Sequence, residues 1–351
     1  MRPSSTSNVV AKEPLGLRLA GLDGLRAVAV IVVVLFHGGV LPFGWVGVNL
    51  FFCLSGFLIT GILLDAKATG ASIKSILVPF YVRRALRILP LAMLAALIVA
   101  LVTNAGWSTL WYVTYLVNWK PWPPPPRELG HYWTLAVEEQ YYMLWPIVVL
   151  LLSPSRLIKT ATSLLVLCSV ARAILICWAP TFATPHFLGN ATITRADPIL
   201  IGSALALIAR DGFGNLLRYK ETAYWVASLG LVTAAVFEWL RKVSSPDWSS
   251  KAAYVFIEPS LALGLGAILL LVLLQPPKWL QWGWLENLGR VSYGIYVIHG
   301  CISPWLRANI ADPPMRTAVL LSLSIVLASL SWKLFESPIL SFKDRWPMPQ
   351  R

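Results

Sequence analysis

The 351-residue sequence is poor in charged residues, which make up 13% of the chain against about 25% in globular proteins. Hydrophobic residues make up 57%, and the mean hydropathy is +0.67. This apolar content excludes an intrinsically disordered chain. It also favours a membrane protein over the two or three soluble domains, roughly, that the length alone would predict.

Cysteine and histidine are also scarce. The four cysteines, at positions 53, 168, 177 and 301, lie in apolar runs without pairing or metal-ligand spacing, which excludes a fold built on disulfides. The four histidines are spread over the chain, so we expect no metal site. Glycine-rich phosphate loops, G-x-S-x-G elbows and HExxH motifs do not occur in the sequence. The sequence therefore carries none of these catalytic signatures.

Long apolar runs dominate the sequence instead. Between Leu25 and Leu64, the only ionisable side chains besides Cys53 are Arg26 and His37, and about 20 apolar residues suffice to span a bilayer. The runs and their breaks predict an all-α, polytopic membrane bundle of about ten transmembrane helices. The predicted spans start near Leu25, Trp45, Ile88, Trp133, Thr160, Asp197, Ala223, Tyr254, Val291 and Met315.

The net charge of +13 comes from 29 Lys and Arg against 16 Asp and Glu. More than twice as many basic residues fall on one predicted side of the membrane as on the other, which by the positive-inside rule predicts both termini in the cytoplasm. We therefore expect a lipid bilayer and not nucleic acid as the partner of the basic surface. Residues 1–24 have no signal-peptide core and are predicted to be a cytoplasmic tail. Residues 25–336 are predicted to be a multi-pass domain of the cytoplasmic (inner) membrane, and residues 337–351 a second cytoplasmic tail.

Ionisable residues inside a span are costly and mark candidate functional sites. Arg26 and His37 are eleven positions apart, which places them about 20° from a whole number of turns and about 16 Å apart along one helix face. With Arg26 at the cytoplasmic boundary, His37 reaches the bilayer midplane or beyond. The helix could then contact a cytosolic anion at one end and present an imidazole at the other. The structural alternative is that Arg26 snorkels to headgroups and His37 bonds a neighbouring carbonyl.

Three arginines, Arg83, Arg84 and Arg87, precede the third predicted span in the segment RRALRILP. Arg83 and Arg87 share a helix face because they are four residues apart. Guanidinium groups bind phosphates through paired donors, so this segment predicts an anion clamp. The structural alternative is a positive-inside stop signal.

His131, Glu138 and Glu139 lie at the start of the fourth predicted span, in HYWTLAVEEQYYMLWP. In a continuous helix His131 and Glu138 share a face, while Glu139 points about 100° away. One carboxylate could then orient or deprotonate an imidazole, and the other could pair with an arginine. The structural alternative is that both carboxylates sit at the headgroup level.

Further polar residues lie in the last two predicted spans. Tyr293, Tyr296 and His299 recur every three residues in SYGIYVIHG, which predicts either a polar stripe or an aromatic packing face. Glu336 closes the last span, and we expect it to have a cationic partner because a carboxylate there opposes the helix dipole.

Two more charged sites receive structural interpretations. Arg195 and Asp197 are predicted to form a local ion pair. Arg172 lies in mid-span and requires a partner that the sequence does not identify.

These motifs, in this order, resemble the acyltransferase 3 family of integral membrane acyltransferases, over nearly the whole chain. The sequence departs from the family pattern at two positions: Asn49 stands where members often have Asp, and Thr134 where the family block usually has Ser. Because Asn49 removes a carboxylate, no mechanism is built on that position. The segments that carry the resemblance are GLDGLRAVAVIVVVLFH (21–37), GVNLFFCLSGFLIT (47–60), RRALRILP, HYWTLAVEEQYYMLWP, SYGIYVIH and FESP.

The resemblance implies a membrane O-acyltransferase. Such an enzyme moves an acyl group, commonly acetyl, from cytosolic acyl-CoA to a hydroxyl of an exported or lipid-linked carbohydrate or glycolipid. Acyl-CoA is then a co-substrate, and no bound cofactor is expected. Some members carry a second, esterase-like domain, and this sequence resembles the stand-alone form.

Residue roles follow by combining the resemblance with the polar positions. His37 would act as a general base or carry the acyl group itself, and a glutamate would orient an imidazole as in catalytic triads. The catalytic candidates are His37, His131, Glu138 and Glu139; the acyl-CoA-binding candidates are Arg26, Arg83, Arg84 and Arg87; the supporting candidates are Tyr296, His299 and Glu336.

The main alternative is a multi-pass transporter or flippase whose buried Arg, His and Glu residues form a proton path. The arginine motif at the cytosolic end favours the acyltransferase, and so does the lack of paired broken helices of the kind that transporters use.

Overall fold

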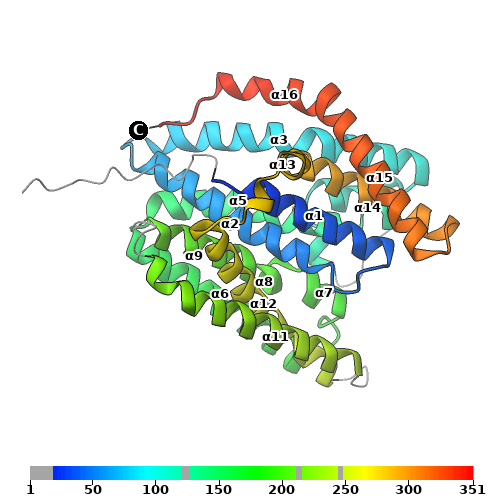
Figure 1. Cartoon of the computed structure of the whole chain (residues 1–351), viewed down its shortest axis with the longest axis horizontal. Coiled ribbons are helices and arrows are strands. Elements are labelled where there is room, and N and C mark those ends of the chain that lie inside the picture. The colour runs from blue at the N-terminus through cyan, green and yellow to red at the C-terminus, as the bar shows by residue number, and fades with distance from the viewer. Residues whose placement is uncertain (1–18, 121–125, 211–215, 244–247, 351) are drawn as a thin grey trace, which may run out of the picture.

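The computed structural model describes residues 19–120, 126–210, 216–243 and 248–350. Most of the predicted N-terminal tail, residues 1–18, lies outside these ranges. The described residues form helices and connections without any strand, which confirms the predicted all-α class. The helices pack into one bundle, with α3 and α16 along one side, α6 and α11 along the other, and α1 and α2 between them (Figure 1).

Each of the ten predicted spans falls on a helix. Six helical segments among the described residues are long and apolar enough to cross a membrane, so the exact number of spans stays a prediction. The helices on the predicted spans are α1 (Leu22–Gly38), α2 (Val46–Lys67), α3 (Ile73–Thr103), α5 (Tyr132–Leu151), α6 (Pro154–Trp178), α9 (Asp197–Ala209), α11 (Lys220–Val243), α12 (Trp248–Leu274), α14 (Ser292–Asn309) and α15 (Pro313–Ser331). Short helices connect or extend them: α4 (Leu110–Val113), α7 (Pro185–Asn190), α8 (Thr192–Arg195), α13 (Gly283–Arg290) and α16 (Ser337–Ser341).

The third helix is longer than predicted. It begins at Ile73 and not near Ile88, so the three arginines of RRALRILP lie within the helix and not ahead of it. At the other end of the chain, residues 337–345 form α16 and a short 3₁₀ turn, and both pack against α3. The arginine segment therefore faces the bundle and the C-terminal segment instead of a loop.

Glycines allow the central helices to touch backbone to backbone. A Cβ atom at Gly56 of α2 would lie 1.9 Å from the carbonyl oxygen of Ile199 in α9, and one at Gly202 of α9 would lie 2.0 Å from the carbonyl oxygen of Cys53. Small residues at such contacts are typical of membrane helix pairs, which gain stability from close packing where water provides no hydrophobic driving force. The contact between α2 and α9 therefore requires glycine on both helices.

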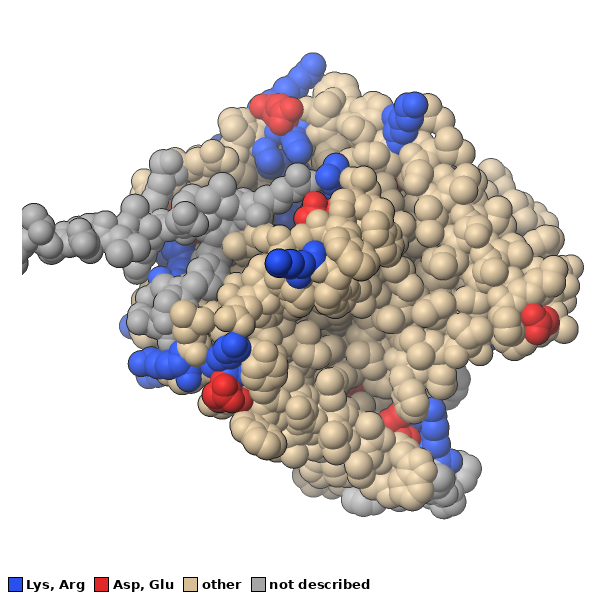
Figure 2. Space-filling model, viewed as in Figure 1, with Lys and Arg blue, Asp and Glu red and all other residues tan. Residues whose placement is uncertain are grey.

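The surface matches a multi-pass membrane protein. Large apolar side chains are exposed on several helices, including Leu101, Val102, Trp225 and Leu334, each at least 70% exposed. Soluble monomers rarely expose apolar patches of this extent. In Figure 2 most of the visible Lys and Arg side chains lie on the half of the molecule near the C-terminus, and broad uncharged surface covers much of the rest. The outside of the bundle is therefore suited to lipid.

A fully buried ion pair joins α6 to α9. Arg172 donates to both carboxylate oxygens of Asp197, at 2.7 and 2.8 Å, and also to Ser169 Oγ and to the carbonyl oxygen of Thr194. Both side chains of the ion pair are 0% exposed. The predicted pair between Arg195 and Asp197 is wrong, because Asp197 faces α6 and satisfies Arg172.

Removing one partner of this pair is expected to destabilise the bundle. Arg172→Met leaves the Asp197 carboxylate buried without its counter-charge, which costs about 3–5 kcal/mol. The melting temperature of the purified protein in detergent should fall markedly, whereas the double variant Arg172→Met/Asp197→Leu should regain most of the loss. A single variant as stable as the wild type would show that the pair contributes nothing.

Candidate active site

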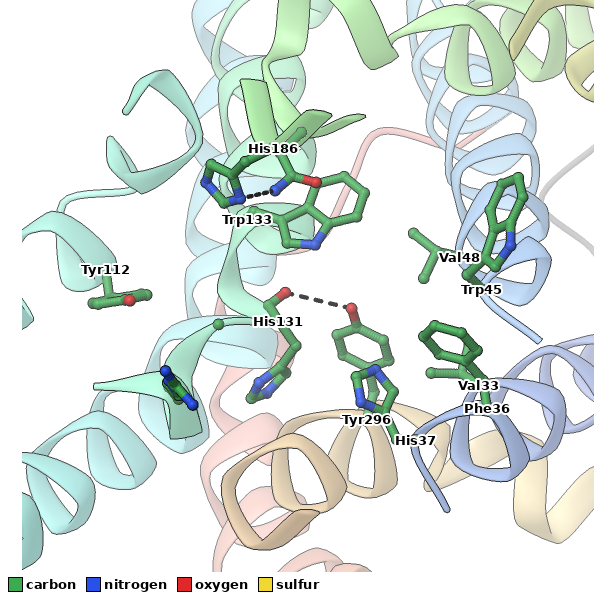
Figure 3. A pocket seen from close by; sticks show the side chains of 13 residues that line it. Val33, Phe36, His37, Trp45, Val48, Tyr112, His131, Trp133, His186 and Tyr296 are labelled. Atoms are coloured by element: carbon green, nitrogen blue, oxygen red, sulfur yellow. Dashed lines mark hydrogen bonds between the residues drawn. The ribbon is translucent and has the colours of Figure 1, made fainter. Parts of the chain in front are cut away.

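A cavity of about 710 Å³ lies where the end of α1 meets the starts of α2 and α5. Residues from α1, α2, α5, α7 and α14 face it (Figure 3). Aromatic rings make up much of the wall, and Arg127 is the charged residue among the lining side chains. The lining residues are Val33, Phe36, His37, Trp45, Val48, Tyr112, Arg127, Gly130, His131, Trp133, His186, Asn190 and Tyr296.

Three imidazoles that are far apart in sequence gather beside this cavity: His37 and His131 line it, and His299 packs against both. The rings of His37 and His299 are 5.0 Å apart between centroids, at an interplanar angle of 70°. The rings of His131 and His299 are 5.6 Å apart. The sequence identifies all three histidines as separate candidates. No spacing rule predicts that the end of α1, the start of α5 and the middle of α14 meet.

His131 is packed as a buried side chain with no hydrogen-bond partner. It directly precedes α5, is 7% exposed, and neither ring nitrogen has a partner among the described residues. The Tyr296 hydroxyl lies 3.4 Å from the backbone oxygen of His131 (Figure 3), and Tyr296 Oη is 2.7 Å from Thr134 Oγ1. Burying polar groups without partners costs about 1–3 kcal/mol each. A bound substrate that forms hydrogen bonds with these two nitrogens would offset that cost.

The backbone at His37 is held by two arginines that the sequence analysis did not select. Arg307 of α14 donates to the carbonyl oxygen of His37 at 3.0 Å, and Arg316 of α15 donates to that of Gly38 at 2.8 Å. Both guanidinium groups complement the negative end of the α1 dipole. Gly39 ends the helix at φ 100°, a left-handed conformation that suits glycine. The sequence does not predict these contacts, because nothing in the segments around Arg307 and Arg316 indicates that they pack against the first helix.

The wall beside Trp133 is supported by a second buried ion pair. Arg195 pairs with Glu258 of α12 and donates to Asn49 Oδ1, while Asn49 Nδ2 donates to Glu258 at 3.2 Å. The guanidinium of Arg195 also lies 5.2 Å from the centre of the Trp133 ring. Asn49 therefore bridges the two charges of an ion pair and does not itself face the cavity.

The predicted pairing of an α5 glutamate with His131 is wrong. Glu138 accepts a hydrogen bond from Ser55 Oγ at 2.5 Å, and Ser55 in turn accepts one from the Tyr142 hydroxyl. Seven residues of helix separate His131 and Glu138 by about 10 Å along the axis. The two side chains share a face, as predicted, but lie at different depths in the bundle.

Glu138 and Glu139 belong instead to a charged cluster that includes Arg26, Arg84 and Arg87. The charges of Arg26, Glu138 and Glu139 all act on Arg84. The guanidinium of Arg84 also lies over the rings of Phe80 and Tyr142, at 5.8 and 5.6 Å.

The sequence predicts a cationic neighbour for Glu336, and the structure places Arg87 near enough for the two charges to interact. Glu336 lies in a short π-helical segment, Trp332–Glu336, and accepts from Ser331 Oγ at 2.8 Å. Its charge acts on Arg87. Such π-helical insertions often occur at functional sites, and here Oε1 of Glu336 lies close to Gly294 of α14, where a Cβ atom would be 3.1 Å from it.

The arginine segment divides into two parts. Arg84 and Arg87 have no hydrogen bond or ion pair among the described residues, which leaves their N–H donors free. Arg83 lies elsewhere and donates to the carbonyl oxygens of Lys343 and Trp346. The predicted clamp of Arg83 with Arg87 is therefore not assembled, because Arg83 holds the C-terminal segment.

Arg26 and His37 lie near opposite ends of α1. Arg26 pairs with Asp23 at 2.8 Å and is not among the residues that line the cavity at His37. The cavity at His37 and the charged cluster are therefore two separate sites along the bundle.

Gly300 makes room for the His131 ring and is a site residue that the sequence analysis missed. A Cβ atom at Gly300 would lie 2.1 Å from His131 Nδ1 and 2.4 Å from Cγ. Because the ring is buried and cannot swing away freely, Gly300→Ala is expected to displace it and to reduce turnover about tenfold or more. A steady-state assay checks this, with Gly283→Ala as the control, since a Cβ there meets nothing within 4 Å. Equal turnover in both variants would contradict the placement of His131 at the site.

Comparison with known proteins gives one matching family model, described as an acyltransferase domain, over residues 19–333. Similar proteins include a putative peptidoglycan O-acetyltransferase of Bacillus subtilis (32% identical; 92% of this chain, 55% of that protein). The peptidoglycan O-acetyltransferase OatA of Listeria monocytogenes is 28% identical, with 91% of this chain and 55% of that protein covered. A putative O-acetyltransferase of Staphylococcus aureus is 25% identical, with 91% and 57% covered. The chain thus spans about half the length of these relatives. No solved structure matches it.

Proposed function

The chain belongs to the acyltransferase family whose model covers residues 19–333, and from this membership we propose that it is a membrane-embedded O-acyltransferase. The family predicted from the motifs is thereby confirmed, while the reaction is our proposal. The observation that carries it is the placement of His37 on a cavity large enough for a sugar unit, with His131 also lining that cavity and His299 packed against both rings.

In this proposal His37 is the general base. Its free ring nitrogen takes the proton of an acceptor hydroxyl, and the hydroxyl oxygen attacks the carbonyl carbon of a thioester. The C–S bond then breaks, and the imidazolium returns the proton to the leaving thiolate. A covalent relay through an acyl-imidazole is the second possible course. Both courses begin at His37.

Acyl-CoA, commonly acetyl-CoA, is the proposed donor. Arg84 and Arg87 offer unused guanidinium donors within the bundle, and Arg26 adds its charge to the same cluster. Guanidinium forks suit phosphate oxygens. We place this cluster on the cytosolic side of the inner membrane, in line with the charge bias of the sequence.

The proposed acceptor is a carbohydrate hydroxyl. Trp45, Trp133, Phe36 and Tyr112 give the cavity apolar walls, on which the apolar faces of sugar rings can pack. Because relatives are named as peptidoglycan O-acetyltransferases, a peptidoglycan glycan is the first acceptor to test.

The experiment is turnover of radiolabelled acetyl-CoA by the purified protein in lipid nanodiscs, with soluble peptidoglycan fragments as acceptors. We expect label to appear in the glycan as an alkali-labile ester. Absence of transfer, together with uptake of labelled glycan into proteoliposomes without acetyl-CoA, would favour the transporter alternative and overturn the proposal.

A further inference from the structure

We propose that His299 is a positioning residue that holds His37 in one tautomer, by accepting a hydrogen bond from the His37 ring through Nε2. This inference rests on the proposed function of His37. It concerns the residue that orients the base, a role that sequence reasoning gave to a glutamate.

The tautomer of His299 follows from its own helix. Its Nδ1 lies 3.1 Å from the carbonyl oxygen of Ile295, and a carbonyl oxygen can only accept. Nδ1 therefore carries the proton, and Nε2 of the neutral ring is an acceptor. His299 is 0% exposed, and its Nε2 has no partner among the described residues. A buried acceptor without a donor is costly, so this nitrogen requires an N–H group.

His37 is the ring best placed to supply that N–H group. Its centroid is 5.0 Å from that of His299, against 5.6 Å for His131. A separation of about 5 Å between centroids allows two imidazoles to meet through their ring nitrogens at about 2.9 Å. The rings now meet edge to face, so a small rotation of His37 forms the bond while its backbone stays held by Arg307 and Arg316.

No carboxylate competes for this role, since among the described residues neither Asp nor Glu is hydrogen-bonded or ion-paired to His37, and Arg307 is the charged group that acts on it. In the bond, one ring nitrogen of His37 donates to His299, which leaves the other nitrogen unprotonated and free to face a hydroxyl. When that nitrogen takes the hydroxyl proton, His37 becomes a cation that still donates to His299. The proton returns to the leaving thiolate, and His299 keeps its own proton throughout.

The test compares His299→Gln with His299→Leu. Gln can present an amide oxygen to His37, whereas Leu fills a similar volume without an acceptor. We expect His299→Leu to lower kcat about 10²–10³-fold with an unchanged KM for acetyl-CoA, and His299→Gln to stay within about tenfold of the wild type. Ile302→Leu on the same helix is the control for packing. Equal kcat losses in the Gln and Leu variants would overturn the proposal.

A second measurement does not depend on turnover. ¹⁵N spectra of histidine-labelled protein, assigned with a His37→Gln variant, report the tautomer of His37 directly. A single tautomer is expected in the wild type and in His299→Gln, and a mixture in His299→Leu. An unchanged single tautomer in His299→Leu would refute the positioning role. A mixture in a protein that transfers no acyl group would uphold that role while the proposed function fails.

Discussion

Replacing His37 with Gln is expected to lower acyl transfer by about 10²–10⁴-fold, the range of rate enhancement that a positioned general base supplies. Gln has similar size but cannot take a proton near neutral pH, so binding should survive while chemistry fails. The measurement is steady-state transfer of labelled acetyl groups to glycan, with kcat and the KM for acetyl-CoA determined separately. The loss should lie in kcat.

The folded state of this variant can be checked independently. Arg307 and Arg316 bond to backbone carbonyl oxygens of α1, which the substitution leaves in place. His37→Gln should therefore insert into the membrane and melt like the wild type. Activity within threefold or so of the wild type would remove His37 from the mechanism, because even a modest base contributes far more.

The second large effect is expected at the charged cluster. Arg84→Gln and Arg87→Gln each remove a guanidinium whose N–H donors have no hydrogen-bond or ion-pair partner among the described residues. Charge-assisted hydrogen bonds contribute about 1.5–3 kcal/mol, so the KM for acetyl-CoA should rise about 10–100-fold per site. Lysine at either position keeps the charge without the fork and should give an intermediate KM.

The matched control removes two positive charges elsewhere. Arg156 and Lys159 at the start of α6 are exposed, on the side that the charge bias also predicts to be cytoplasmic. The double variant Arg156→Gln/Lys159→Gln should leave the KM for acetyl-CoA near that of the wild type. An equal increase in KM in this control would mean that overall charge, and not the cluster, attracts the donor.

Much of the architecture could be predicted because it depends on local patterns. Apolar runs of sufficient length form helices wherever they occur, and each predicted span lies on one. The sequence predicts a start for α3 that is too late, because the arginines of RRALRILP resemble a helix boundary, whereas the helix begins at Ile73. In the bundle, Arg84 packs over two aromatic rings and near carboxylates. These contacts compensate its charge, so the arginine can lie within a helix that faces the bundle.

The pairings between helices could not be predicted from spacing. Arg172 finds Asp197, and Arg195 finds Glu258, because crossing helices bring these residues to one depth. Depth also explains the failure of the expected pair between His131 and Glu138: periodicity along a helix reports the face of a side chain, and neighbouring helices decide which residues meet at each level. Gly300 gave no signal at all, since its role is to leave space.

The contacts of Arg307 and Arg316 with the end of α1 have a consequence for biosynthesis. The first helix leaves the ribosome early, and the two helices that supply these arginines leave near the end of synthesis. His37 therefore enters the membrane long before the groups that anchor its carbonyl are made. The imidazole cluster assembles only after nearly the whole polypeptide has been inserted, so a nascent chain stalled before α14 has no competent centre.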